Sequence, residues 1–214
     1  MEDMDTAARA LCENITGAQL AYVQSDEISI LLTDFGSPQT EAWFNGSVQK
    51  LASLSASLTT AHFNAARGRR TLPPEAILAC FDSRAFTIPD RTEVENYFHW
   101  RQQDAARNSV SMTAQAHFPH ERLQGKSTNE MQEMLWSEKG VNWNDLPGGF
   151  KRGRCIVRRR ITKDAEYQDK RTGGTYTVSG IERWAWEQIV PPAFTKDRNW
   201  LRAHIPQAES ETTQ

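Results

Sequence analysis

Cysteine is scarce in this 214-residue sequence, and its placement argues against the usual metal and disulfide frameworks. The three cysteines are Cys12, Cys80 and Cys155. An odd count leaves at least one thiol unpaired, and these spacings fit no zinc-binding motif. We therefore expect reduced thiols and a cytoplasmic protein, because disulfides persist mainly in oxidising compartments.

Long apolar runs and an excess of one charge are also lacking. No stretch of 18 consecutive apolar residues occurs, so the sequence predicts neither a transmembrane helix nor a membrane partner. The first five residues are acidic and show no signal-peptide pattern. The net charge of -2 argues against a strongly cationic nucleic-acid-binding protein but leaves room for a local basic patch.

A phosphate-binding P-loop is absent despite the suggestive tripeptide Gly125-Lys126-Ser127. The motif requires a glycine five residues before Gly125, where His120 stands. Ser127 followed by Glu130 instead predicts a capping box that opens a helix to about residue 136. Lys126 is kept as a candidate contact for a phosphate of RNA.

The most informative feature that is present is an acidic turn near the N-terminus. Residues 20–24 and 28–32 are rich in β-branched, aromatic and aliphatic side chains, so they predict the two strands of a hairpin. The turn between them reads Ser25-Asp26-Glu27. Two carboxylates there can hold Mg²⁺ for nucleotidyl transfer. The alternative is a solvated hairpin tip, because acidic residues are common in turns.

Hydrophobic periodicity outlines the remaining elements. Apolar residues at helical spacing predict three helices, over residues 6–15, 41–66 and 93–117. Segments typical of strands, the second preceded by a Gly-Gly turn at residues 172–175, occupy residues 76–88 and 176–189. Polar composition predicts a disordered tail over residues 207–214.

A polar line runs along the third predicted helix. Arg101, Asp104 and Asn108 stand three and four residues apart, so they share one face close to the buried stripe. One interpretation is a polar cluster that faces a substrate cleft. The other is an intrahelical Arg101–Asp104 pair on a half-exposed face.

A basic run occupies residues 151–160, where six of ten side chains are cationic. They are Lys151, Arg152, Arg154, Arg158, Arg159 and Arg160. In a chain of negative net charge, this concentration indicates contact with a polyanion. The alternative is the solvated face of an edge strand, which basic residues protect from aggregation.

Taken in order, ten short segments resemble the histidine-tRNA guanylyltransferase family, in particular its bacterial and archaeal guanylyltransferase-like members. They are residues 22–29, 43–44, 49–50, 61–64, 81–84, 97–104, 107–109, 125–127, 141–144 and 151–153. The resemblance runs from about residue 5 to about residue 190. It is carried by the number and order of the segments, since none of them would carry it alone.

The resemblance implies an α+β fold: a polymerase- or cyclase-like palm with a ferredoxin-like βαββαβ sheet, then a helical and β-hairpin extension. We expect the palm over residues 1–120, the extension over residues 121–206 and the tail over residues 207–214. The implied activity is 3′-to-5′ nucleotide addition at the 5′ end of a tRNA. ATP or GTP activates that end, and the 3′-hydroxyl of GTP or of a templated nucleotide displaces the activating group. Two Mg²⁺ ions per site and a homo-tetramer are implied as well.

The resemblance also assigns roles to individual residues. Asp26 matches a metal-binding aspartate on the hairpin, and with Glu27 it forms the candidate catalytic pair. Lys50 matches a basic position near the triphosphate, and Lys151 and Arg152 would face the RNA or the triphosphate. With the tip serine and the polar line included, the nucleotide-binding candidates are Ser25, Lys50, Arg101, Asp104 and Asn108. The RNA-binding candidates are Lys126, Lys151, Arg152, Arg158, Arg159 and Arg160.

Two departures from the family pattern refine these expectations. Eukaryotic members carry His-Ile-Asn-Asn-Leu-Tyr where residues 106–111 read Ala-Arg-Asn-Ser-Val-Ser, so we expect templated repair of tRNA 5′ ends over strict specificity for histidine tRNA. The family's first strand, which bears an Asp-Gly pair, has no match before Asp26, and we expect an upstream in-frame segment to encode it. Without that strand, the hairpin and residues 76–88 would each lack a partner along one side.

Three functions remain open from the sequence. The leading one is the Mg²⁺-dependent tRNA nucleotidyltransferase. The second is a catalytically impaired fragment that binds RNA or a partner subunit. The third is a cyclase-like palm enzyme that acts on a nucleotide alone, against which the basic run argues.

Overall fold

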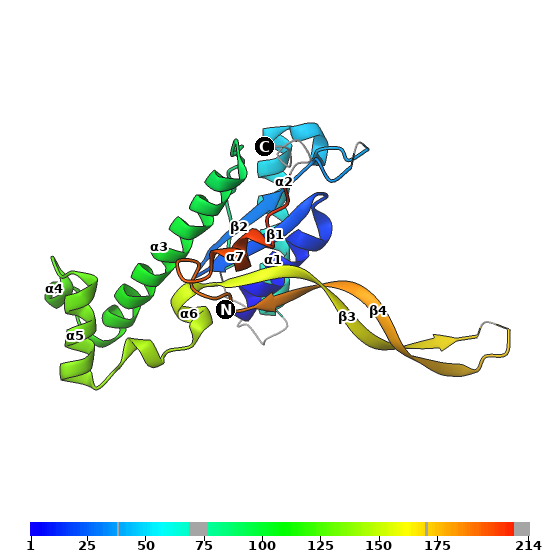
Figure 1. Cartoon of the computed structure of the whole chain (residues 1–214). Helices are drawn as coiled ribbons and strands as arrows, with labels where there is room; N and C mark the ends of the chain where they lie inside the picture. Colours follow the sequence, from blue (N-terminus) through cyan, green and yellow to red (C-terminus); the bar gives the residue numbers. More distant parts are fainter. Residues whose placement is uncertain (38, 69–76, 170, 208–214) are drawn as a thin grey trace.

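The computed structural model describes residues 1–37, 39–68, 77–169 and 171–207, and it has the α+β fold class expected from the sequence (Figure 1). The helices are α1 (Glu2–Asn14), α2 (Val48–Gly68), α3 (Arg91–His117), α4 (His120–Leu123), α5 (Thr128–Lys139), α6 (Gly148–Arg152) and α7 (Arg198–Arg202). Two short 3-10 helices are η1 (Trp43–Gly46) and η2 (Trp143–Asp145). The strands are β1 (Ala18–Gln24), β2 (Glu27–Leu32), β3 (Arg154–Gln168) and β4 (Thr175–Ile189).

One antiparallel sheet with the order β2-β1-β3-β4 organises the fold. The predicted hairpin is formed by β1 and β2, which a two-residue turn joins. On its other side, β1 pairs with the first residues of β3, from Arg154 to Val157. Because β1 has a strand on each side, its backbone polar groups are satisfied and it is buried from Leu20 to Gln24.

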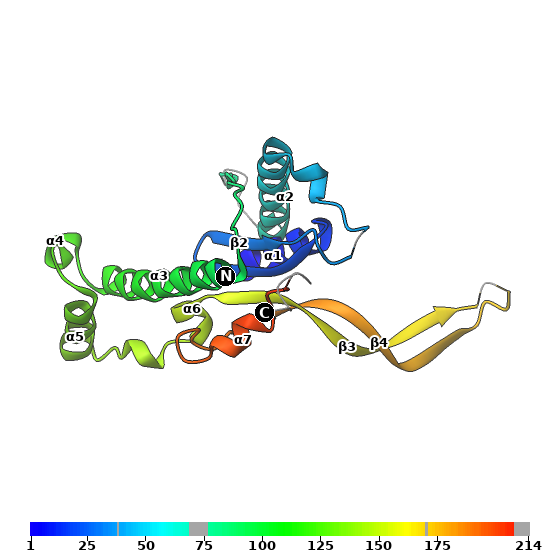
Figure 2. The ribbon, with the colours of Figure 1, turned by 45° about the horizontal axis from the view of Figure 1, so that its top comes forward.

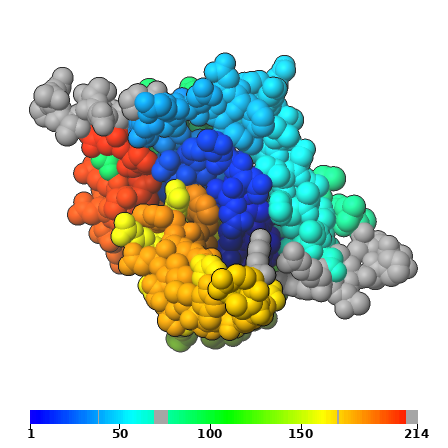
Figure 3. All heavy atoms as spheres, turned by 90° about the vertical axis from the view of Figure 1, so that its right-hand side faces the viewer, coloured from blue at the N-terminus to red at the C-terminus, as the bar shows by residue number. Residues whose placement is uncertain are grey.

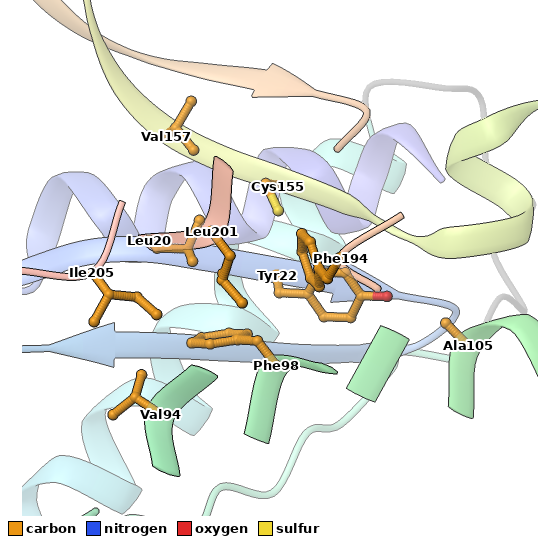
Figure 4. Close-up of a cluster of buried hydrophobic side chains, with 10 residues drawn as sticks. All are labelled: Leu20, Tyr22, Val94, Phe98, Ala105, Cys155, Val157, Phe194, Leu201 and Ile205. Carbon is orange, nitrogen blue, oxygen red and sulfur yellow. The ribbon is translucent and has the colours of Figure 1, made fainter. Parts of the chain in front are cut away.

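Helices cover both faces of this sheet (Figure 2). Alternation along β1 sends Leu20 and Tyr22 to one face and Ala21 and Val23 to the other. The first face packs against α3 and α7, in the cluster drawn in Figure 4: Leu20, Tyr22, Val94, Phe98, Ala105, Cys155, Val157, Phe194, Leu201 and Ile205. The second face packs against α1, in a cluster of Met4, Ala8, Cys12, Ala21, Val23 and Ile156. Each large core side chain contributes roughly 1.5–3 kcal/mol by leaving water.

Beyond Val157, β3 pairs only with β4, and the two strands continue as a ribbon that projects from the body (Figure 1). Most of its side chains are exposed. Figure 3 looks toward this ribbon, in yellow and orange, with the blue N-terminal part of the chain between it and the cyan α2. The predicted Gly-Gly turn and the predicted strand over residues 176–189 are confirmed.

Several helix predictions are confirmed and one needs correction. The helix predicted over residues 93–117 is α3, and Ser127 and Glu130 form the predicted capping box of α5. The helix predicted from residue 41 begins only at Val48. Phe44 and Asn45, with φ angles of 49° and 52°, adopt left-handed backbone conformations that interrupt a helix.

The strand predicted over residues 76–88 is wrong for residues 77–88, which pair with no strand in the described part of the chain; residue 76 lies outside that part. Side chains of α2 take the place of a neighbouring strand. The Asn64 amide donates to the Ala79 carbonyl and accepts from its N–H, at 2.8 and 3.0 Å. Thr60 Oγ1 accepts from the Phe81 N–H at 3.1 Å. β2 is likewise without a strand along its outer edge among the described residues.

Four further predictions can be compared with the fold. The predicted domain boundary at residue 120 stays a prediction, although β1 and β3 pair across it in one sheet. The predicted tail lies outside the described residues, except for Gln207. No helix in the described ranges is both long and apolar enough to cross a membrane. The three cysteines are free thiols, as expected, and burial raises the pKa of Cys12 to about 12.

Candidate functional site

The tip of the hairpin presents Asp26 to solvent. Ser25 and Asp26 form the turn between β1 and β2, and both side chains are exposed. Ser25 has a φ of 45°, in the left-handed region that tight hairpin turns use. The predicted position of Asp26 at an exposed tip is therefore confirmed, whereas its role stays a prediction.

Glu27, the other acid of the predicted pair, is engaged within the protein. Alternation places it on the same face of β2 as Ser29, which meets the Tyr97 hydroxyl of α3 at 2.9 Å. The Glu27 carboxylate forms an ion pair with Arg101 of α3. The Gln24 side-chain amide donates to Glu27 Oε2 at 2.7 Å. Both hairpin acids are exposed, but only Glu27 is shown tied to α3 among the described residues.

Arg101 is the buried cation of this site. Only 11% of its side chain is exposed, and its guanidinium lies 4.8 Å from the centre of the Trp100 ring. Because a buried charge is costly without a partner, the ion pair with Glu27 decides where this guanidinium lies. Asp104 provides a second carboxylate, 3.9 Å from Arg101 Nη1.

The polar line predicted on α3 is brought together by the fold. Asp104 accepts from Arg107 at 3.1 Å and from the Asn108 amide at 3.2 Å, in addition to its contact with Arg101. The intrahelical Arg101–Asp104 pair considered above is present, but Arg101 also bridges to the hairpin. The polar residues of α3 therefore form one cluster with Glu27 of the hairpin, which Arg101 contacts.

Lys50 lies away from this cluster. It is exposed near the start of α2, where its amine stands 5.5 Å from the centre of the Phe44 ring. Figure 1 shows that α2 begins near the end of β2, at the opposite end of the hairpin from its tip. The structure does not bring Lys50 together with Asp26, and its role at the nucleotide stays a prediction.

Lys151 and Arg152, at the start of the basic run, both make contacts within the protein. Lys151 is buried: its amine donates to the Asn144 carbonyl and lies over the Trp143 ring. The backbone carbonyl of Arg152 accepts from the Tyr22 hydroxyl at 2.7 Å. Burial above all raises the pKa of Tyr22, so the phenol stays protonated and remains a donor.

Gly153 makes this junction possible. Its φ is +75°, and a Cβ there would fall 2.5 Å from the Tyr22 hydroxyl oxygen. Only glycine fits a position that combines this backbone conformation with so close an approach. The turn from α6 into β3 is thereby pressed against the hairpin strand that carries the acidic tip.

The last cations of the run are exposed on the ribbon. Arg158 and Arg160 point to one face of β3, and both guanidinium groups lie 5.4 Å from the centre of the Trp184 ring of β4. Trp184 is 56% exposed, and Arg160 also stands 3.6 Å from Glu182. Arg159 is exposed and follows the opposite alternation. These four residues, Arg158, Arg159, Arg160 and Trp184, form the ribbon patch.

Lys126 stands apart at the start of α5. Its amine pairs with Glu130 at 3.1 Å. The pKa of Glu130 is lowered to about 2, mainly by hydrogen bonds from the Ser127 backbone and side chain. The interaction with Lys126 lowers it further. Lys126 is partly engaged in the capping structure that the sequence predicted, and its contact with RNA stays a prediction.

Sequence reasoning missed two residues of these clusters. Gln24 stands directly before the acidic turn, and its pairing with Glu27 across a two-residue hairpin could have been anticipated from the register. Trp184 of β4 is the second residue, and composition alone does not associate it with the arginines of β3. Its position opposite Arg160 in the ribbon register supplies that link.

Two described residues at the hairpin tip, Ser25 and Asp26, could contribute ligands to Mg²⁺. Mg²⁺ takes oxygen ligands, and proteins often hold it through one or two carboxylates together with substrate phosphates and water. Asp26 offers an exposed carboxylate and Ser25 a hydroxyl beside it. Within the described ranges, no three His, Cys, Asp or Glu side chains gather as a metal-binding group. An ion here would rest on Asp26 and on the phosphates of a bound nucleotide.

Two family models match consecutive parts of the chain. The model described as tRNAHis guanylyltransferase matches residues 1–89, and the Thg1 C terminal domain matches residues 92–188. The tRNA(His) guanylyltransferase of Schizosaccharomyces pombe is 32% identical over 178 residues, which are 78% of this chain and 66% of that protein. A probable tRNA(His) guanylyltransferase of Drosophila melanogaster is 28% identical over 168 residues, 74% of this chain and 57% of that protein. The chain therefore spans 57–66% of the length of these two relatives.

Solved structures agree with these matches. A bacterial tRNA(His) guanylyltransferase (Thg1)-like protein in complex with ATP is 40% identical and superimposes with a TM-score of 0.79, covering 96% of this chain and 78% of its own. The tRNA(His) guanylyltransferase from Saccharomyces cerevisiae is 29% identical, with a TM-score of 0.61 over 73% of this chain and 72% of its own.

Proposed function

The chain belongs to the tRNA(His) guanylyltransferase family, and from that premise we propose that it adds nucleotides to the 5′ end of tRNA in the 3′-to-5′ direction. The observation that carries the proposal is the exposed Asp26 next to Glu27, which pairs with Arg101 of the Arg101–Asp104–Asn108 cluster. Bacterial Thg1-like relatives have been solved with ATP and with GTP, which are the proposed nucleotide substrates.

The two hairpin acids have different roles at the proposed site. Asp26 holds Mg²⁺, which when bound supplies positive charge at the phosphate under attack; a second ion is part of the proposal. Glu27 fixes Arg101, so that its guanidinium keeps one position beside the tip. Asp104 orients Arg107 and the Asn108 amide, whose remaining N–H groups are available to a nucleotide. Ser25 adds a hydroxyl next to Asp26.

The ribbon patch is the proposed RNA contact. Arg158, Arg159 and Arg160 are exposed, as a contact with phosphates requires, and Trp184 holds two of them in place. Arg152 and Lys126 stay secondary candidates. Lys151 is left out of this surface because it is buried, and we propose that it positions the α6 turn.

The proposal also covers the location, the assembly and the domain division of the protein. The protein acts in the cytoplasm, assembles as a homo-tetramer, and is divided into a palm and an extension near residue 120. Sedimentation velocity measures the assembly directly: a tetramer of the 24.3 kDa chain is expected, and a lone monomer would contradict that part.

The activity is tested with a tRNA that lacks its first 5′ nucleotide. The full chain is incubated with this tRNA, ATP, labelled GTP and Mg²⁺, and the product is resolved by gel. We expect extension at the 5′ end that requires ATP or GTP for activation and stops when EDTA removes the metal. Extension of a 3′ end, or labelled product with no tRNA present, would overturn the proposed reaction.

A second function is favoured by one observation: no other carboxylate stands free beside Asp26 among the described residues, because Glu27 is paired with Arg101. A chain with a single available carboxylate could bind tRNA without adding nucleotides. Tight, salt-dependent tRNA binding together with no extension under every nucleotide condition would select this second function.

A further inference from the structure

Gln24 is a buried polar residue at the edge of the site. It ends β1, 5% exposed, and stands directly opposite Glu27 in the hairpin register. Its side-chain N–H donates to Glu27 Oε2 at 2.7 Å. The amide therefore reaches across the two-residue turn and holds the Glu27 carboxylate.

Glu27 in turn controls Arg101. The guanidinium is almost enclosed, and its contacts are the Glu27 carboxylate, the Trp100 ring and the more distant Asp104. If Glu27 rotated away, Arg101 would be drawn toward Asp104 or toward the tip, where Asp26 carries the opposite charge. The three side chains Gln24, Glu27 and Arg101 thus form a chain of contacts from β1 through β2 to α3.

This arrangement leaves two polar atoms unsatisfied. Gln24 Oε1 and Arg101 Nε are both buried and have no hydrogen-bond partner in the described part of the chain. Burying an acceptor without a donor costs free energy, and a methionine of similar size would avoid that cost. The benefit that offsets it is the one hydrogen bond that the amide does make, to Glu27.

We propose that Gln24 is a positioning residue of the nucleotidyl-transfer site. Its amide holds Glu27 on Arg101, and this keeps the arginine off Asp26, whose carboxylate then stays open to the metal and the nucleotide. The inference rests on the proposed function, which it deepens by naming a residue that touches neither substrate nor metal.

The test is a double-mutant cycle on the full chain. Gln24→Met keeps the length of the side chain and removes the donor, and Glu27→Met removes the group on which Gln24 acts. We expect Gln24→Met to lower kcat for nucleotide addition about tenfold with KM for the nucleotide changed less than about threefold. In the Glu27→Met background the same change is expected to cost less than about twofold, because its target is gone.

Two controls separate positioning from folding. Gln24→Glu has the same shape but places two carboxylates together, so it is expected to lose at least as much activity as Gln24→Met. Gln19→Met removes an amide of the same strand that bonds Thr33 at the other end of the hairpin. Its effect is expected to add independently to that of Glu27→Met. Full activity of Gln24→Met, or a loss that adds independently to that of Glu27→Met, would overturn the inference.

The same cycle on urea unfolding distinguishes this inference from the proposed function. Coupling between Gln24 and Glu27 in the unfolding free energy is expected whether or not the chain adds nucleotides. A wild type without activity would overturn the proposed function, and with it the positioning role, while the coupling would still verify the contact. An active wild type whose Gln24 and Glu27 show no coupling in unfolding would overturn the Gln24 inference alone.

Discussion

The arginines beside the hairpin and the arginines of the ribbon have the same side chain in opposite environments. Arg101 is 11% exposed and is held by a carboxylate from another element. Arg158 and Arg160 are exposed and are ordered by the face of one tryptophan. A buried guanidinium must have its partners inside the protein, so it shapes the site. An exposed one held on an aromatic ring still presents N–H groups to solvent, so it can contact a phosphate.

This contrast separates two properties that the proposed function requires. The hairpin end carries the proposed chemistry, and it is well supported because β1 is paired on both sides and packed on both faces. The ribbon carries charge away from the body, and most of its side chains are exposed. Changes at the two places should therefore have different consequences for catalysis, stability and binding.

The largest effect is expected at the tip. Asp26→Ala removes the carboxylate proposed to hold the metal and should abolish nucleotide addition, a loss worth several kcal/mol in the barrier. Binding of tRNA should stay within a few-fold, because the ribbon patch is intact. Single-turnover extension and filter binding measure the two properties. If Asp26→Ala keeps most of its activity, the assignment of the site is wrong.

The next largest effect is expected on stability, where the buried Arg101 should matter more than the exposed ribbon arginines. Arg101→Met leaves Glu27 without its cation and leaves Asp104 paired with Arg107 alone. We expect a loss of about 1–3 kcal/mol, smaller than for a fully buried pair because 55% of the Glu27 side chain is exposed. Arg158→Met on the ribbon should change stability by less than about 0.5 kcal/mol. Urea unfolding monitored by tryptophan fluorescence checks both. Equal losses would show that the ribbon arginines contribute as much to the stability of the fold as Arg101 does.

In the salt dependence of tRNA binding, the exposed ribbon arginines should matter more than a buried cation. Replacing Arg158, Arg159 and Arg160 together by glutamine should weaken tRNA binding and flatten the plot of log affinity against log salt. Each lost phosphate contact lowers that slope by roughly 0.7–0.9. Lys151→Met serves as a matched control, because this cation is buried and should leave the slope unchanged. An unchanged slope in the triple variant would mean that the ribbon is only a solvated surface.

The smallest effect is expected far from both regions, at the capping box of α5. Hydrogen bonds from Ser127 lower the pKa of Glu130 to about 2 in the folded protein, below the usual value of about 4.3 for glutamate. Its contribution to stability is therefore fully present above the unfolded pKa and is lost as pH falls toward 2. Relative to Glu130→Gln, the wild type should lose a small part of its stability in that window. Parallel curves of melting temperature against pH for the two proteins would contradict this.

The sequence predicted those features that depend on residues close together along the chain. The hairpin and the capping box follow from turn chemistry, and the α3 line follows from helical spacing. The strand predicted over residues 77–88 is wrong because a strand needs a neighbouring strand as partner. Here the side chains of Asn64 and Thr60 in α2 form hydrogen bonds with the backbone of this segment instead.

The same limit applied to the candidate site. Periodicity placed Arg101 near Asp104 but could not show that Glu27 lies across from it, because that contact joins elements more than 70 residues apart. Composition grouped Lys151 with Arg158, although Trp143 and Asn144 enclose only the lysine. Which cation of a basic run is free depends on packing that the run does not encode.

The central claim is that the two neighbouring hairpin acids have different roles: Asp26 holds the metal, and Glu27 holds Arg101. Manganese binding in the presence of GTP, followed by electron paramagnetic resonance, tests it most directly on the wild type, Asp26→Asn and Glu27→Gln. We predict that Asp26→Asn weakens metal binding at least about tenfold, a loss of about 1.4 kcal/mol or more, and that Glu27→Gln changes it less than about threefold. Equal losses in both variants, or a greater loss for Glu27→Gln, would contradict this division.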